Sequence, residues 1–157
     1  RSSDLPCDVD ACRESALRLL DAADRPSGAL RDRLIDKGYD DETVAAVVDR
    51  LIEVGLVDDE SYAQSAVRYC VGRLMGYRGA VMELARKGVD RPLAERVCDE
   101  ARMSGVFEDA AWELGRRSAA KTQGMNPKVR KRRFWSSGGR KGHDAETLRA
   151  VAHELFD

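Results

Sequence analysis

The sequence repeats itself with a period of about 50 residues. Three Lys-Gly pairs, each followed two residues later by an aspartate, mark the repeat: Lys37-Gly38 with Asp40, Lys87-Gly88 with Asp90, and Lys141-Gly142 with Asp144. Self-similarity at a fixed period of this length indicates an array built from one small structural unit. A single unit of this size buries little surface by itself, so neighbouring units have to pack in series.

Apolar residues within the units recur at helical spacing. Asp40 is a candidate N-cap and Gly55 stands where a left-handed residue would end the helix. Between them the apolar residues follow the i, i+3, i+4, i+7, i+8 pattern of one helix face: Val44, Val47, Val48, Leu51 and Ile52. No alternating run of β-branched residues competes with this pattern. We therefore expect an all-α protein of eight or nine short helices, arranged as three tandem three-helix repeats that form an elongated, curved array.

Each unit should contain a longer helix, a short helix that ends in Lys-Gly, and a third helix opened by aspartate. The third copy is four residues longer, and we place the extra residues in a loop at Ser136-Ser137-Gly138-Gly139. The expected division is an N-terminal flank at 1–13, a candidate disordered segment, followed by repeats at 14–57, 58–107 and 108–157.

The formal net charge of −1 conceals a gradient along the chain. Residues 1–58 carry 8 Lys and Arg against 14 Asp and Glu (net −6), residues 59–107 carry 8 against 7 (net +1), and residues 108–157 carry 11 against 7 (net +4). This polarity suggests a partner that meets one end electrostatically, such as nucleic acid or an acidic protein surface. The alternative is that these charges belong to ordinary solvated helix faces.

Several features favour a cytoplasmic location. No apolar run approaches a membrane span or follows the pattern of a signal peptide. Cys7, Cys12, Cys70 and Cys98 have no CxxC spacing, so reduced thiols are more plausible than a disulfide framework.

The densest basic run lies in the third unit beside two aromatic residues, Phe134 and Trp135. Cations neutralise phosphates, and an exposed ring offers a stacking surface to an unpaired base, so the combination suits single-stranded DNA or an acidic groove on a protein filament. The alternative is a solvated basic face, with both aromatic rings in the core. The candidate contact residues of this run are Lys128, Arg130, Lys131, Arg132, Arg133, Trp135, Arg140 and Lys141.

A second basic set recurs in or beside the short middle helices of the first two units. If the units stack, these residues could form a discontinuous basic stripe, whereas local pairing with Asp32, Asp36 or Glu83 is the alternative. The members of this set are Arg31, Arg33, Lys37, Arg68, Arg73, Arg78, Arg86 and Lys87.

We expect no catalytic residues, no metal site and no cofactor. Only His143 and His153 are present, and the cysteines do not combine with them in a zinc-binding spacing. Residues 138–142 lack the spacing of a phosphate-binding loop. The acidic pairs Asp58-Asp59 and Glu108-Asp109 are expected to cap helices.

Residues 55–63, Gly-Leu-Val-Asp-Asp-Glu-Ser-Tyr-Ala, resemble the signature of the RecX family, Gly-Leu-(apolar)-Asp-Asp-x-x-(aromatic)-Ala. Residues 29–39 resemble the family's first Lys-Gly segment, and Val67-Arg68, Glu83-Leu84 and Lys87-Gly88-Val89 resemble its second repeat. The resemblance spans about residues 14–157. The chain departs from the family at 76–79, where Gly-Tyr-Arg-Gly replaces a Gly-Pro-like turn, and around Phe134 to Gly142.

The resemblance implies a non-enzymatic regulator of the RecA recombinase. A serial array of small units needs no dimer, so we expect a monomer. Such proteins lodge in the groove of the RecA filament on single-stranded DNA and inhibit strand exchange, ATP hydrolysis and co-protease activity, which limits DNA recombination, DNA repair and the SOS response. RecA, its filament and single-stranded DNA are therefore the expected partners, with duplex DNA as a further candidate and no membrane. The alternatives from other classes are a helix-turn-helix transcription factor and a passive helical scaffold.

Overall fold

The computed structural model describes residues 5–157, and these residues form nine α-helices and no strand. The predicted all-α class and the predicted helical repeats are confirmed. The helices are α1 (Val9–Ala22), α2 (Ser27–Asp36), α3 (Asp41–Glu53), α4 (Asp59–Gly72), α5 (Tyr77–Arg86), α6 (Arg91–Met103), α7 (Val106–Lys121), α8 (Pro127–Arg140) and α9 (Ala145–Phe156).

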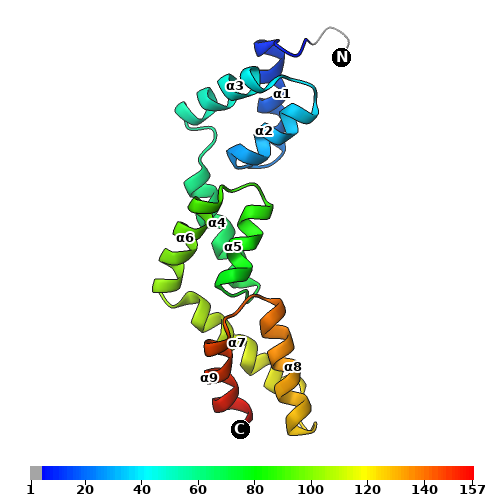
Figure 1. Ribbon diagram of the computed structural model, residues 1–157, viewed down its shortest axis with the longest axis vertical. Coiled ribbons are helices and arrows are strands. Elements are labelled where there is room, and N and C mark those ends of the chain that lie inside the picture. The colour runs from blue at the N-terminus through cyan, green and yellow to red at the C-terminus, as the bar shows by residue number, and fades with distance from the viewer. Residues whose placement is uncertain (1–4) are drawn as a thin grey trace.

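The helices group in threes, which we call unit 1 (α1–α3), unit 2 (α4–α6) and unit 3 (α7–α9). Each unit has its own cluster of buried side chains, centred on Leu30 and Leu34 in unit 1, Leu84 in unit 2, and Phe134 and Val151 in unit 3. Figure 1 shows the units following one another along an elongated molecule, with the N-terminal and C-terminal units at opposite ends. The acidic and basic ends of the sequence are therefore also opposite ends of the fold.

The predicted start and stop signals act as expected in the third helix of unit 1. The Asp40 carboxylate accepts a hydrogen bond from the Thr43 amide at 2.8 Å, and Gly55 has a φ of 83°. The glycine of each Lys-Gly pair also has a positive φ, a backbone conformation that is sterically unfavourable for a residue with a side chain. These glycines are Gly38 (106°), Gly88 (104°) and Gly142 (85°).

The expected loop at Ser136-Ser137-Gly138-Gly139 is wrong, because these residues are part of α8. With 14 residues, α8 is longer than the 10-residue helices α2 and α5. The extra four residues thus add about one turn to a helix. Glycine at position 138 allows α8 to pack closely on α9, because a Cβ there would overlap the Leu148 side chain of α9.

The N-terminal boundary and one capping pair also differ from expectation. The Asp8 carboxylate caps α1 by accepting a hydrogen bond from the Ala11 amide at 3.0 Å, so the helix begins at Val9. Helix α1 therefore includes part of the N-terminal flank that we predicted at 1–13. Residues 1–4 of that flank lie outside the described residues. Helix α7 begins at Val106 with Gly105 as its N-cap, so Glu108 and Asp109 lie inside the helix and cap nothing.

The middle helices α2, α5 and α8 succeed one another along the long axis with their ends in close approach (Figure 1). A methyl group on Gly28 of α2 would come within 2.5 Å of the Gly88 carbonyl oxygen behind α5. Similarly, the Gly76 amide ahead of α5 donates to the Lys141 carbonyl behind α8 at 2.8 Å. Each junction therefore places the amino end of one middle helix on the carboxyl end of the next, so that their dipoles have the same direction.

The acidic pair at 58–59 serves two different helices. Asp58 caps α4 through the Ser61 amide at 3.0 Å, as expected. The Asp59 carboxylate instead accepts from the Ser27 amide at 2.7 Å and from the Ser27 hydroxyl at 2.5 Å, at the amino end of α2. Asp59 therefore joins unit 2 to unit 1.

Candidate nucleic-acid interface

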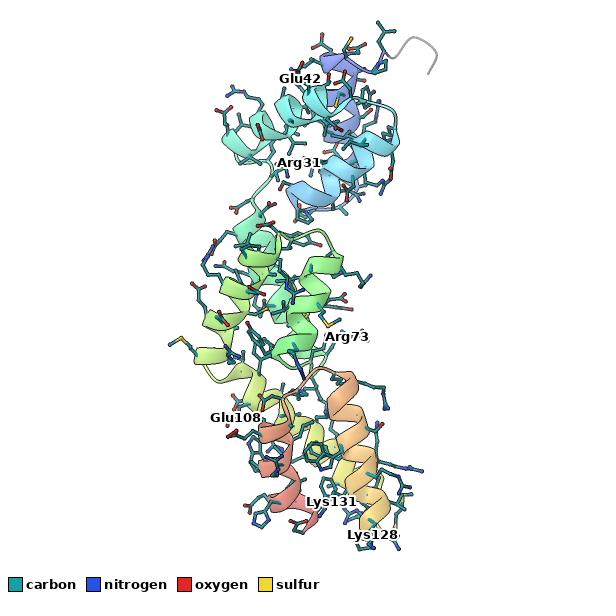
Figure 2. The ribbon with its side chains drawn as sticks, viewed as in Figure 1. Arg31, Glu42, Arg73, Glu108, Lys128 and Lys131 are labelled. Carbon is teal, nitrogen blue, oxygen red and sulfur yellow. The ribbon has the colours of Figure 1, made fainter. Side chains whose placement is uncertain are left out.

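The basic run of unit 3 lies on α8 and at its C-cap. This helix has no acidic residue, and its added turn contributes Lys128 and Arg130. Figure 2 shows Lys128 and Lys131 near the end of unit 3 and Arg73 close to the boundary between units 2 and 3. Phe134 is fully buried in the core, whereas Trp135 is only partly buried.

Few of these cations are neutralised within the part of the chain that the structure describes. Of the seven, only Lys131 has a carboxylate within 4.0 Å, that of Asp157. Arg132 and Arg133 are exposed. Exposed cations without carboxylate partners keep their positive potential available to an anionic surface.

Arg130 has a structural role. Its guanidinium donates to Thr122 Oγ1 at 3.1 Å and to the Ala119 carbonyl at 3.0 Å, and it lies 5.4 Å from the centre of the Phe156 ring. Arg130 of α8 is thus joined to α7 by its hydrogen bonds and to α9 by its contact with the Phe156 ring, so that it links the three helices of unit 3.

Trp135 lines a hollow of about 410 Å³ at the outer end of α8, which we call the tryptophan hollow. A partly exposed ring surrounded by cations suits the stacking of an unpaired base whose phosphates lie on the neighbouring side chains. The other residues that line it are Pro127, Lys128, Lys131, Arg132 and Phe156.

A second hollow, of about 400 Å³, lies where α4, α7 and α8 meet, and we call it the junction hollow. It brings Arg73 of the second predicted set together with Arg133 and Lys141 of the first. It also contains Arg117 and Lys121, which we did not predict from the sequence. Their i, i+4 spacing on α7 was the only local signal, because the other cations arrive from distant segments.

The remaining residues of the second set are more dispersed. Arg86 and Lys87 both pair with Glu83, at 2.6 and 3.7 Å. This is the local pairing that we gave as the alternative to a basic stripe. The Arg86 guanidinium hydrogen-bonds the Glu83 carboxylate and holds the pKa of that carboxyl below its usual value. Arg31 lies 3.8 Å from Asp49. Arg33, Lys37, Arg68 and Arg78 are exposed, and a continuous stripe through them stays a prediction.

The described residues contain no group of three or more His, Cys, Asp and Glu side chains that could hold a metal ion. Within the same part of the chain, none of the helices has the length and apolarity needed to cross a membrane.

The large aromatic residues at equivalent repeat positions are used for packing. Tyr62 packs against the unit 2 core and Trp112 against the unit 3 core, and both are partly buried. Trp135 is therefore the tryptophan that the fold presents beside the unpaired cations.

Three three-helix units in series, with most of the cations that lack a carboxylate partner in residues 5–157 on the last unit, define a helical-repeat protein with a basic end. Residues 12–51 match the family model "RecX, first three-helix domain". The regulatory protein RecX of Thermobifida fusca is 37% identical over 91% of this chain and 78% of its own length. That of Mycobacterium sp. strain JLS is 49% identical over 47% of this chain and 41% of its own length. The chain belongs to the RecX family.

The same fold is present in solved structures. The crystal structure of RecX from Lactobacillus salivarius aligns with a TM-score of 0.83 at 20% identity, covering 96% of this chain and 98% of that one. The crystal structure of another regulatory protein RecX aligns with a TM-score of 0.79 at 18% identity, covering 92% and 73%. The arrangement of three units in series is thus shared despite low sequence identity.

Proposed function

We propose that this protein binds RecA filaments on single-stranded DNA and inhibits their strand-exchange, ATPase and co-protease activities. Membership of a family whose relatives are named regulatory protein RecX supports a regulatory role. The observation that carries the filament contact is the set of α8 cations without carboxylate partners in residues 5–157. A filament on DNA is a polyanion to which such cations are attracted.

The elongated shape fits an extended binding surface. The basic third unit would meet the phosphates or acidic surface of the filament, and the acidic first unit would lie at the far end. Inhibition requires no catalytic step, because preferential binding to inactive or shortened filaments is enough to shift the population towards them. This role places the protein in the cytoplasm as a monomer beside RecA.

The tryptophan hollow gives the proposed surface a second kind of contact. Lys128 and Arg132, which have no carboxylate partner in residues 5–157, can neutralise backbone phosphates while the Trp135 ring stacks on a base. Such stacking tolerates any base, so the contact with single-stranded DNA should have little sequence preference.

Fluorescence anisotropy with RecA-coated single-stranded DNA tests the contact. Arg132→Glu reverses an exposed charge on α8, and Arg149→Glu on α9 is the matched control because Arg149 is exposed in the same unit but lies outside both hollows. We expect Arg132→Glu with Arg133→Glu to weaken binding strongly at low salt and less at high salt. The salt slope should fall by about 1.4 if each cation meets one phosphate of a single strand.

Two results would count against the proposal. One is unchanged affinity of the Arg132→Glu, Arg133→Glu variant across the salt titration. The other is tight, sequence-specific binding of duplex DNA in the absence of RecA, which would favour a helix-turn-helix transcription factor.

A further inference from the structure

We propose that the junction hollow is a phosphate-binding site. It collects five cationic side chains from three helices and their ends, namely Arg73, Arg117, Lys121, Arg133 and Lys141, and no carboxylate lines it. Guanidinium and ammonium groups that converge in this way form a preferred environment for phosphate oxygens.

The charges of the hollow are not balanced by the protein. Of these five cations, only Arg117 has a carboxylate partner within residues 5–157, Glu113, at 3.0 Å. Arg73 donates to the Tyr69 hydroxyl at 3.2 Å, which leaves its charge in place. Like charges that converge without acids repel each other, and an external anion removes that repulsion.

One of the cations, the Lys141 ammonium, is held by the backbone of the junction itself. Lys141 Nζ donates to the Arg73 carbonyl at 2.9 Å, across 68 residues of sequence, and the Gly76 amide donates back to the Lys141 carbonyl at 2.8 Å. The bond to a neutral carbonyl holds the ammonium in position without cancelling its charge. Lys121 and Arg133, by contrast, are exposed and can adjust to a ligand.

The rest of the lining favours phosphate over base recognition. The hydroxyl-bearing residues Ser118, Thr122 and Ser137 line the hollow. Its apolar part comes from Leu74 and Leu114, and no aromatic ring is available for stacking. The tryptophan hollow, by contrast, is lined by the aromatic rings of Trp135 and Phe156. The junction hollow should therefore bind phosphate groups regardless of the base or sequence that carries them.

Its place in the fold implies that a ligand would stabilise the contact between units 2 and 3. The hollow is lined by Gly72, Arg73 and Leu74 from the end of α4 and by residues of α7 and α8. A ligand that binds only when these elements are assembled raises the stability of the assembled state. Phosphate binding should thus be visible as a rise in melting temperature as well as in a binding isotherm.

The phosphate could come from the DNA backbone or from a free oligophosphate, which share the same chemistry. The first source rests on the proposed function and would make the hollow a contact along the filament-bound strand. The second would act on the protein alone. Inorganic tripolyphosphate and a fifteen-residue oligothymidylate distinguish the two sources.

Isothermal titration calorimetry at low salt with both probes tests the site. Lys121→Glu and the double variant with Arg133→Glu change exposed side chains, and Arg149→Glu provides the same charge change outside the hollow. We expect tripolyphosphate affinity to fall about tenfold or more in the double variant and to stay within about twofold of the parent in Arg149→Glu. At 100 times its dissociation constant, tripolyphosphate should raise the melting temperature of the parent by about 5 °C.

Parallel loss of oligothymidylate binding in the double variant assigns the hollow to the DNA backbone, and loss of tripolyphosphate binding alone assigns it to a free oligophosphate. The proposal is overturned if the hollow variants and Arg149→Glu have the same affinities for both probes, or if neither probe binds the parent. RecA ATPase inhibition by Lys121→Glu is measured on the same samples. Retained inhibition with unchanged phosphate binding would reject this site and leave the proposed function standing.

Discussion

His143 Nε2 donates a hydrogen bond to the carbonyl oxygen of Leu74 at 2.8 Å and thereby joins unit 3 to unit 2. The imidazole is buried, and Leu74 has a φ of 63°, the only positive φ of a non-glycine residue among residues 5–157. A side chain with a branched Cγ is seldom held in this left-handed conformation. The imidazole bond gives the Leu74 carbonyl a partner at the place where the chain turns out of α4.

Removal of this bond should destabilise the protein. His143→Ala leaves the Leu74 carbonyl without its partner and opens a cavity, so we expect a loss of about 1–3 kcal/mol in the free energy of unfolding. Urea denaturation measures the loss. His153→Ala is the control because that ring is 78% exposed, and a similar loss in both variants would contradict the role assigned to His143.

The same histidine should make stability depend on pH. Burial lowers the pKa of His143 from its ordinary value of 6.5, because the charged ring loses solvation. Below about pH 6.5 the unfolded chain therefore binds more protons than the folded one, and stability should be full above that pH and decrease as the pH falls towards the folded-state pKa. Melting temperatures between pH 7.5 and 5.5 test this slope, which should be absent in His143→Gln and present in His153→Gln.

Two adjacent glycines of α8 should respond to alanine in opposite directions. A Cβ at Gly138 would overlap Leu148, whereas nothing lies within 4 Å of a Cβ at Gly139. We expect Gly138→Ala to cost about 1–3 kcal/mol through overpacking, and Gly139→Ala to stabilise the helix by about 0.5 kcal/mol. Equal effects on the urea midpoint would show that this stretch is not helical as described.

The thiols should differ sharply in reactivity. Cys7 is exposed, while Cys12, Cys70 and Cys98 are buried and free. Burial raises the pKa of Cys98 to about 12, and it raises the pKa of Cys12 and Cys70 as well, so few thiolates form there at neutral pH. A thiol reagent should modify one cysteine per chain in the native protein and four after denaturation, and rapid native modification of more than one would contradict the burial.

The repeat and most helix boundaries could be predicted because their signals are local. Asp40 and Gly55 act within a few residues of their own helix, and the Lys-Gly pairs mark equivalent turns in each unit. The helical state of Ser136 to Gly139 could not be predicted, since weak helix formers favour a loop when considered alone. Contact with α9, through the space that Gly138 leaves for Leu148, decides the conformation.

The candidate site was predicted only in part for a similar reason. The basic run on α8 is continuous in sequence, so its members were easily recognised. The junction hollow joins Arg73 to Lys141 across 68 residues, and no spacing in the sequence relates them. Which residues line the hollow depends on how unit 3 packs on unit 2. This packing involves backbone contacts at Gly76 and Gly79 that only the assembled fold shows.

The most direct measurement of the central proposal is the DNA-dependent ATPase of RecA with added protein, at low and moderate salt. The parent protein should inhibit hydrolysis in a concentration-dependent manner, and the Arg132→Glu, Arg133→Glu variant should require about tenfold more protein or more for the same inhibition, whereas Arg149→Glu should match the parent. ATP hydrolysis that proceeds at its full rate with saturating parent protein would contradict the account.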